Sequence, residues 1–592
     1  MEMRWSLNEL YSSFDSEEFS GDLKRVDQMI GGIQNWTEKN LISHDEADRK
    51  LEDHLRMMTD FNNLFIKVMA FATLTSSVDV RNDTALKIVE SLQEKYTDLT
   101  EPMIRFQKWV ASLENIDDYF KYSPPLKEHS FYLHDLIENS KYLLEGEVEV
   151  LIAKMSNTGS KAWSKLQDHI SSTLMVDIEL NGQSKQLPLS IVRNMAYDKD
   201  EPTRKTAYEA ELKAYKKVED YSAAALNSIK GEVITVSHMR GYKSPLHQTI
   251  IDSRIDEETL IAMLEAIKES IPVFQKYYKK KAEILGYSNG LPFYNIFAPV
   301  GDVDIKFTYD ESKDYIVKNF RTFSDRLADY ALKAFENKWI DAEPREGKRG
   351  GAFCYNIHPI GESRILSNFS GSLSSVTTLA HELGHGYHGL CMEDETVLNS
   401  NYTMPIAETA SIFCETIIMK AALKEASQEQ AFSILETSIS DAGQVIIDIY
   451  SRFLFESELF EKRRVHSLSV DELKDIMSKS QKEAYGEGLD HNVLHPYMWI
   501  NKPHYYSAGL NFYNFPYAFG LLFAKGVYSE YLERGDSFVP EYDKLLASAG
   551  KNHITDVAKM IDIDIRSIDF WRSSLKLIEQ DIEHFISLSN NR

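Results

Sequence analysis

Residues 371–391 read GSLSSVTTLAHELGHGYHGLC, and this stretch decides the local fold. Ser374 and Ser375 precede apolar residues at helical spacing, so we expect a helix that is capped by one of the two serines. Within this helix, His381 and His385 are four positions apart. Side chains at that spacing lie one above the other on one helix face, so the two imidazoles are expected to point the same way.

Two stacked imidazoles can bind one Zn²⁺ at about 2.0–2.1 Å, and Glu382 between them projects toward a water on the metal. A catalytic zinc keeps one position open, so it needs only one further protein ligand. In the metzincin pattern that ligand would be a histidine at position 391, but the chain has Cys391 there. The third ligand is therefore expected further along the chain.

The next acidic residues are a polar cluster at 393–395, then Glu408 and Glu415. The cluster falls where the helix should end, which is typical of solvent-exposed charge. Glu408 follows Pro405 in an apolar helical stretch, and a carboxylate on such a face is costly to bury unless it is paired or metal-bound. Glu415 could orient an imidazole N–H from the same face. One zinc per chain is predicted, with the ligands His381, His385 and Glu408.

The remaining patterns predict a mainly α protein with little sheet. From Leu7 to about Trp163 apolar residues recur every three or four positions, which indicates helices. At 174–189 the period changes to two around Asn181-Gly182, which predicts a short hairpin. Helical patterns resume near Pro202 and dominate after residue 370. Three more extended segments are expected, at 302–309, 352–358 and 363–369.

Length and charge limit the classes of function. With 592 residues the chain exceeds one ordinary core, so we expect an N-terminal helical lobe over 1–200 and a catalytic lobe over 201–592. A net charge of −25 argues against nucleic acid as a partner, because phosphate binding needs a basic surface. Residues 1–14 are polar and acidic where an export signal would be apolar, so we expect no such signal, and the apolar run at 64–74 is too short to cross a bilayer. These features favour a cytoplasmic protein without a membrane partner.

The chain has three cysteines, Cys354, Cys391 and Cys414. Their number is odd, and their spacing matches neither a disulfide framework nor a metal-binding CxxC pair. We therefore expect reduced thiols that are mostly buried.

Four blocks resemble the oligoendopeptidase F family, within the group that includes thimet oligopeptidase and neurolysin. They are GGAFCYNI at 350–357, SSVTTLAHELGHGYH at 374–388, IAETASIFCE at 406–415 and PHYYSAGLNFYNFPYAFG at 503–520. The resemblance implies a two-lobed helical, zincin-like peptidase with a small β-sheet beside the active-site helix. It implies the same zinc ligands and a catalytic role for Glu382, with oxyanion donors at His504 and Tyr517 and a weaker candidate at Tyr513.

The predicted function is hydrolysis of internal bonds in oligopeptides, with Glu382 as general base. The strands within 352–369 are expected to pair with the substrate backbone. One alternative is a zinc carboxypeptidase or dipeptidyl carboxypeptidase, which would need a cationic subsite for the substrate C-terminus. The other is a non-catalytic helical peptide-binding protein, although a structural zinc site has no need of Glu382.

Overall fold

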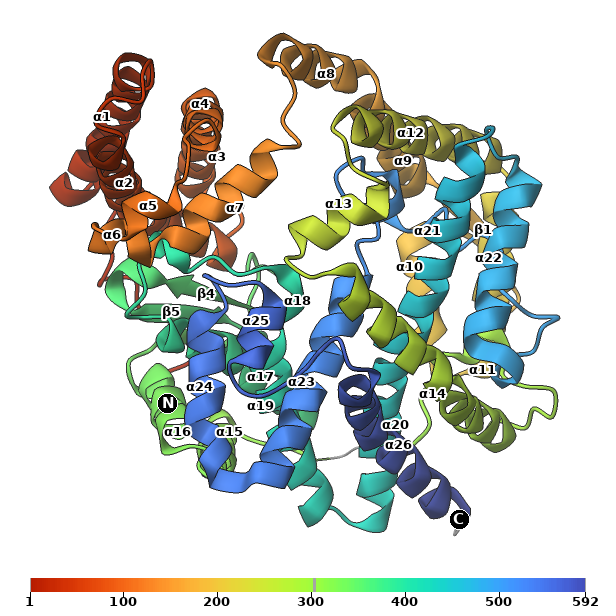
Figure 1. The fold of residues 1–592 in the computed structure, drawn as a ribbon. Helices are drawn as coiled ribbons and strands as arrows, with labels where there is room; N and C mark the ends of the chain where they lie inside the picture. Colours follow the sequence, from red (N-terminus) through yellow and green to blue (C-terminus); the bar gives the residue numbers. More distant parts are fainter. Residues whose placement is uncertain (1, 302–304, 591–592) are drawn as a thin grey trace. The chain divides into compact units, whose positions relative to one another are not determined.

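The computed structural model describes residues 2–301 and 305–590, and Figure 1 shows their course. Helices predominate and the sheets are small, which confirms the predicted mainly α class. The chain forms two compact units, each assembled from three separate stretches. The first unit contains Met1–Lys141, Asp304–Ala421 and Glu530–Ile563, and the second contains Tyr142–Val303, Ala422–Ser529 and Asp564–Arg592. These units are not the consecutive lobes 1–200 and 201–592 that the sequence suggested.

The first unit begins with a helical array. Its second helix, α2, contains the apolar run at 64–74, and Leu64, Val68 and Leu74 are all buried there. Burying each such side chain contributes about 1.5–3 kcal/mol, so this run is a core element of the unit. The array consists of α1 (Glu17–Asn40), α2 (Ala47–Val78), α3 (Asp83–Thr97), α4 (Thr100–Ala111), α5 (Asp117–Phe120), α6 (Pro124–Glu128) and α7 (Ser130–Ser140).

A three-stranded sheet then positions the helix with the two histidines (Figure 1). The central strand β5 (Glu362–Leu366) pairs antiparallel with β4 (Phe353–Ile357) and parallel with β3 (Ile340–Asp341). Helix α17 (Leu373–Cys391) packs against β4 and β5. Two of the predicted extended segments, 352–358 and 363–369, are thereby confirmed as strands.

A strand was predicted at 302–309, but the described residues of this segment, 305–309, do not form one. Residues 302–304 lie outside the described residues, Lys306 makes one isolated bridge to Ser372, and α15 (Tyr309–Phe320) already begins at Tyr309. The reason is local, because Thr308 and Glu311 form a capping box that starts the helix.

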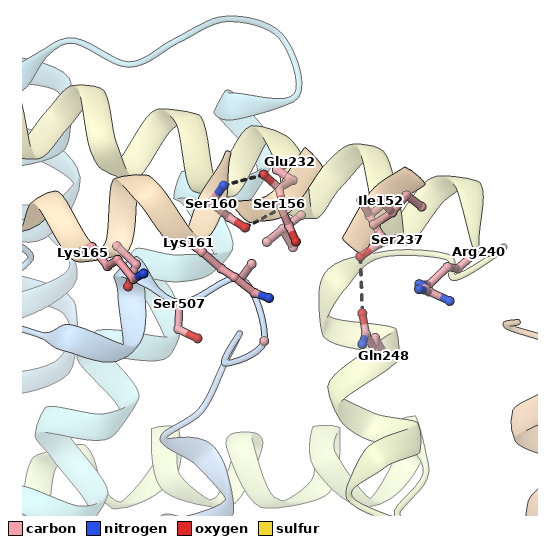
Figure 2. Close-up of a pocket in the computed structure, with 15 residues that line it drawn as sticks. Ile152, Ser156, Ser160, Lys161, Lys165, Glu232, Ser237, Arg240, Gln248 and Ser507 are labelled. Atoms are coloured by element: carbon pink, nitrogen blue, oxygen red, sulfur yellow. Dashed lines mark hydrogen bonds between the residues drawn. The ribbon is translucent and has the colours of Figure 1, made fainter. Parts of the chain in front are cut away.

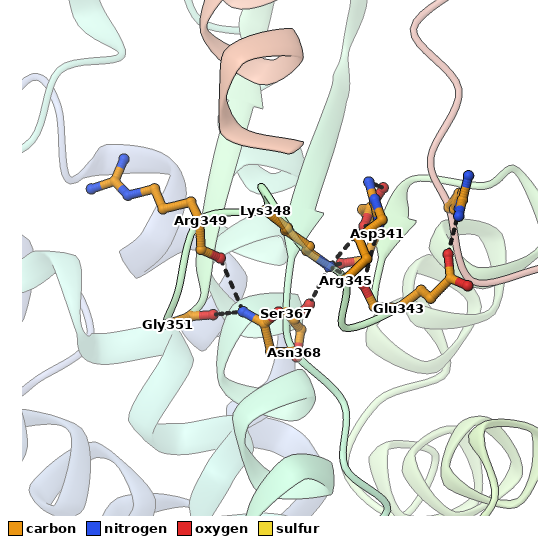
Figure 3. Close-up of polar contacts among 9 residues, drawn as sticks. Asp341, Glu343, Arg345, Lys348, Arg349, Gly351, Ser367 and Asn368 are labelled. Atoms are coloured by element: carbon orange, nitrogen blue, oxygen red, sulfur yellow. Dashed lines mark hydrogen bonds and ion pairs between the residues drawn. The ribbon is translucent and has the colours of Figure 1, made fainter. Parts of the chain in front are cut away.

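A buried polar cluster holds the loop that leads into β4 (Figure 3). The Lys348 ammonium is fully buried and lies 2.7 Å from Oδ1 of Asp341, which also accepts from Arg345 at 2.7 Å. The amide of Asn368 donates to the carbonyl oxygen of Gly351 at 2.9 Å. Because each buried charge has an oppositely charged partner, the loop is fixed to the ends of β3 and β5.

The start of α17 differs from the prediction. Its N-cap is Ser372, whose side chain accepts from the backbone N–H of Ser375, and neither Ser374 nor Ser375 is the cap. The chain turns earlier because Gly371 has a φ of +81°, a conformation that favours glycine. The first unit also contains α16 (Asp325–Glu336), η4 (Val397–Asn399), α18 (Met404–Ala407), most of α19 (Thr409–Glu425), α24 (Val539–Ser548) and α25 (Ile554–Lys559).

The second unit contains the predicted hairpin, β1 (Met175–Leu180) and β2 (Gln183–Pro188). Asn181 and Gly182 have positive φ values of 52° and 70°, as a tight two-residue hairpin turn requires. The helix predicted at Pro202 is α11 (Glu201–Tyr215), capped by Asp200.

The second unit also contains α8 (Gly146–Thr158), α9 (Ser160–Thr173), α10 (Leu189–Asn194), α12 (Glu219–Met239), α13 (Pro245–Asp252), α14 (Glu257–Ile284), α20 (Gln428–Gly443), the π-helical turn η5 (Gln444–Asp448), α21 (Ile449–Arg463), α22 (Val470–Tyr485), η7 (Pro503–Tyr506), most of α23 (Phe515–Arg534) and α26 (Ile568–Asn590).

The cysteines behave as predicted. All three are free thiols, with Cys391 and Cys414 buried and Cys354 partly buried. Burial raises the pKa of the Cys414 thiol, which keeps it protonated. Among the described residues, no helix is long and apolar enough to cross a bilayer.

Candidate metal centre and active site

The structure brings His381, His385 and Glu408 together in the first unit. Oε2 of Glu408 lies 3.3 Å from Nε2 of His381 and 3.4 Å from Nε2 of His385. Two ligand atoms bound to a tetrahedral zinc at about 2.0–2.1 Å would be separated by about 3.3 Å. The three side chains therefore have the spacing and the donor types that fit a zinc ion.

A glycine allows the two chain segments of this cluster to meet. A Cβ atom on Gly384 would lie 2.5 Å from the carbonyl oxygen of Ala410 and 2.6 Å from Cα of Ser411, which is closer than real Cβ contacts. Only glycine lets α17 approach the start of α19 this closely. Glu408 lies at the junction between α18 and α19, where its Oε2 also accepts from the Ser411 hydroxyl at 2.8 Å.

Neighbouring side chains hold His381 by its ring and His385 by its backbone. Oε2 of Glu415 lies 3.3 Å from Nδ1 of His381, as the sequence suggested for a carboxylate behind a ligand. The amide of Asn356 on β4 donates to the carbonyl oxygen of His385 at 3.0 Å. No spacing pattern in the sequence marks Asn356, because this contact depends on how β4 packs against α17.

Charges within the cluster favour a cation. Burial alone lowers the pKa of His381, but the carboxylates of Glu408 and Glu415 more than reverse this and raise it to about 10. For Glu408, burial acts to raise the pKa, and the facing imidazoles overcome it and lower the pKa below its usual range. The negative potential that holds a proton on His381 would equally attract a divalent ion.

Glu382 is the proton acceptor candidate, and its side chain lies on the buried face of α17. The residue is only 6% exposed. Burial raises the pKa of its carboxyl group, although the two nearby imidazoles act in the opposite direction. A carboxylate with a raised pKa accepts a proton more readily than one in water, which suits a general base.

The other predicted residues, His504, Tyr513 and Tyr517, lie together in the second unit. The hydroxyls of Tyr513 and Tyr517 are 2.7 Å apart, and the rings of His504 and Tyr513 have centroids 5.8 Å apart. Burial, assisted by the charges of Arg452 and Lys502, lowers the pKa of His504 to about 3. The imidazole is therefore neutral, and among the described residues its buried Nε2 has no hydrogen-bond partner.

A buried ion pair holds the segment just before Tyr513. Nζ of Lys230 lies 2.9 Å from Oε1 of Glu456 and 2.9 Å from Oδ1 of Asn511. The other oxygen of Glu456 accepts from the backbone N–H of Phe512, which has a φ of +51°. The pair thus fixes an unusual backbone conformation next to the tyrosines. Sequence reasoning missed it because the partners are far apart along the chain.

A cavity of about 490 Å³ adjoins the same region and is lined by residues of α8, α9, α12 and α13 and by residues 507–509 (Figure 2). Glu232 lines this cavity, but its carboxylate accepts from the backbone N–H of Ser160 at 2.7 Å. It therefore satisfies the start of α9, as a capping carboxylate does, and is not a free acid.

Comparison with known proteins gives family matches over most of the chain. The family description Peptidase family M3 matches residues 194–577, and Oligopeptidase F matches residues 111–175. Oligopeptidase PepF of Bacillus subtilis (strain 168) is 22% identical over 596 residues, covering 99% of this chain and 87% of the relative. Group B oligopeptidase PepB of Streptococcus agalactiae serotype III (strain NEM316) is 21% identical over 598 residues, covering 99% and 96%.

Solved structures share the fold. A candidate peptidase from Chlamydophila abortus has a TM-score of 0.86 at 22% identity, covering 99% of this chain and 98% of the other. The oligoendopeptidase-F of Enterococcus faecium has a TM-score of 0.71 at 17% identity, covering 97% and 99%. The fold and the cluster of His381, His385 and Glu408 therefore define a helical metallopeptidase. The chain belongs to peptidase family M3, whose description matches well over half of its length, and this confirms the predicted family.

Proposed function

We propose that this enzyme is a zinc-dependent endopeptidase that hydrolyses internal bonds of short peptides. The observation that carries the proposal is the spacing of 3.3 Å and 3.4 Å between Glu408 and the two histidines, with Glu382 beside them. Zinc bound by these three side chains would polarise the scissile carbonyl and lower the pKa of an attacking water toward about 7.

Glu382 performs the proton transfers. Its carboxylate accepts a proton from the attacking water and delivers that proton to the amine that leaves. The raised pKa of Glu382 supports both steps, because the group must hold the proton until the amine departs. No side chain becomes covalently attached to the substrate, so reagents that modify serine or cysteine should leave activity largely intact.

His504 and Tyr517 donate to the oxyanion that develops on the scissile carbonyl. A neutral imidazole has one N–H to give, and the Tyr517 hydroxyl is held by the bond to Tyr513. Donors that are already oriented in a site with little water contribute the most to catalysis. Tyr513 is the weaker candidate and acts here by positioning Tyr517.

Strand β4 supplies the edge that pairs with the substrate. In the described part of the chain, β4 pairs with β5 alone, so its other edge keeps unpaired N–H and C=O groups. An extended peptide can use such an edge for register, and backbone pairing tolerates many side chains. This supports oligopeptides as the substrates.

The test replaces Glu382 by Gln. Turnover of an internally quenched peptide should be lost while zinc content stays near one per chain, because the metal ligands remain. The Glu336→Gln variant, in an exposed position on α16, is the matched control and should keep full turnover. Normal turnover by Glu382→Gln would refute the assignment of the base.

Test peptides with blocked or free ends distinguish an endopeptidase from the exopeptidase alternative. A peptide blocked at both ends has no free terminus, so its cleavage supports an endopeptidase. If only peptides with a free C-terminus are cleaved, the carboxypeptidase or dipeptidyl carboxypeptidase reading is correct. If no peptide is cleaved although zinc is bound, the peptide-binding alternative holds.

A further inference from the structure

A second cavity in the second unit, of about 410 Å³, contains none of the candidate site residues. It lies among α10, α11, the π-helical turn η5, the start of α21 and residues 495–502. Its walls carry four cationic side chains and only two carboxylates, in a chain whose net charge is −25. The charged residues are Arg193, Arg204, Arg452, Lys502, Glu211 and Asp448.

Hydrogen bonding leaves part of this positive charge uncompensated. Arg204 is satisfied, because it donates to Oδ1 of Asn295 and to two backbone carbonyl oxygens. Arg452 forms an ion pair with Asp448, yet its buried Nε has no acceptor among the described residues. Arg193 lies 3.4 Å from Glu211.

The Lys502 ammonium has neither a hydrogen bond nor an ion pair within 4.0 Å in the described part of the chain. Burial, followed by repulsion from Arg452, lowers its pKa to about 7. The carboxylates of Asp448 and Glu211 act to raise this pKa, but they do not reverse the shift. A cation taken out of water without a partner is costly, and a bound anion would remove that cost.

The backbone of the wall is also unusual. Residues 444–448 form a π-helical turn between α20 and α21, and such turns occur often at functional sites. The turn ends at Asp448, whose carboxylate holds Arg452 and lies 3.4 Å from the hydroxyl of Tyr485. An irregular turn therefore positions the arginine that has an unused donor.

We propose that this cavity binds a small oxyanion, with Arg193, Arg452 and Lys502 as the groups that recognise it. Carboxylates and tetrahedral oxyanions share the chemistry that these donors recognise. The ligand is therefore either a free oxyanion such as phosphate or sulfate, or the carboxylate of a peptide. This site goes beyond the proposed peptidase function and does not rest on it.

The test is calorimetric titration of the full chain, with zinc present, using sulfate at pH 6.5. Saturable binding of one sulfate per chain is expected. Lys502→Met and Arg452→Gln should each weaken it by about tenfold or more, because a charge-assisted hydrogen bond is lost. The controls Lys276→Met and Arg464→Gln remove exposed charges of the same unit and should bind like the unaltered protein.

Lys502→Met keeps the test decisive if Arg452→Gln does not fold, because the Lys502 ammonium has no hydrogen bond or ion pair to lose among the described residues. Without sulfate this variant should melt at the same temperature or higher, since it removes an unpaired cation. Absence of saturable sulfate binding, or equal binding by Lys502→Met, would overturn the proposal. His381→Ala should keep sulfate binding; its loss there would place the anion at the metal centre instead.

Competition identifies the source of the oxyanion. If an acetylated peptide with a free C-terminus displaces sulfate and its C-terminal amide does not, the ligand is a peptide carboxylate. If neither displaces it, the ligand is a free oxyanion. Equal displacement by acid and amide would contradict oxyanion recognition and overturn the proposal.

Discussion

Oε2 of Glu415 lies 3.3 Å from Nδ1 of His381, while Nε2 of the same ring lies 3.3 Å from Glu408. The ring is thus held between two carboxylates, one on each nitrogen. A carboxylate behind a metal-binding histidine fixes the tautomer and increases the basicity of the nitrogen that faces the metal.

Replacing Glu415 by Gln should weaken zinc binding by about 10–100-fold, because the ring loses its charged partner. The affinity is measured by competition with a chromogenic chelator. Glu425→Gln changes an exposed carboxylate on the same helix and should leave the affinity unaltered. An unchanged affinity in Glu415→Gln would show that this carboxylate does not support the ligand.

Gly384→Ala should push α17 away from α19 and lower both zinc affinity and stability. The added methyl group would meet the backbone of Ala410 at 2.5 Å, and overpacking of this kind costs about 1–3 kcal/mol. Chemical denaturation and metal analysis measure the two effects. Gly31→Ala is the matched control in helix α1, where nothing lies within 4 Å, and it should be neutral or stabilising. Equal behaviour of the two variants would contradict this prediction.

Tyr517→Phe should lower kcat by about 10²–10³ with little change in KM, because removing one oxyanion donor affects mainly the transition state. Tyr513→Phe should have a smaller effect, since that hydroxyl contacts Tyr517. Steady-state kinetics on a quenched peptide measure both, with Tyr122→Phe, at an 89% exposed site, as the control. A larger loss in Tyr513→Phe would exchange the roles of the two tyrosines.

The pair of Lys230 and Glu456 should behave as a buried unit. Glu456→Gln alone leaves a fully buried ammonium unpaired, which should cost about 3–5 kcal/mol in the free energy of unfolding. The double variant Lys230→Met with Glu456→Gln should recover part of that loss, because no charge remains buried. The coupling is measured by denaturant titrations of the unaltered protein, the two single variants Lys230→Met and Glu456→Gln, and the double variant. Simple addition of the two single effects would show that the pair is not coupled.

Sulfate binding at the second cavity should depend on pH through Lys502, whose pKa is lowered to about 7. Arg193, Arg452, Glu211 and Asp448 are the charged groups that act on it. Lys502 is protonated below about pH 7, so sulfate binds more tightly there. Above this pH one proton must be taken up, and affinity falls by up to about tenfold per pH unit. Calorimetry from pH 6 to 9 tests this, and Lys502→Arg should flatten the profile. The same slope in Lys502→Arg would exclude Lys502 as the titrating group.

Local patterns in the sequence predicted many of the secondary-structure elements and the candidate metal ligands of this protein. The hairpin at Asn181-Gly182 follows from turn chemistry, and the helix with His381 and His385 follows from apolar spacing. Glu408 could be named because a carboxylate among apolar neighbours needs a partner, and the structure places it next to both imidazoles. These features depend on residues that are close in the chain.

The remaining features depend on the tertiary structure and could not be predicted from local patterns. The cap at Ser372 depends on how Gly371 turns, and the pairing of Lys230 with Glu456 joins segments that are remote in sequence. The two units are assembled from interleaved stretches, and the cationic cavity is lined by residues from widely separated parts of the chain. The periodicity of apolar residues predicts which face of a helix is buried, but it does not predict which other element packs against that face. That choice is made by the packing of the whole chain, and it determines which distant charges meet.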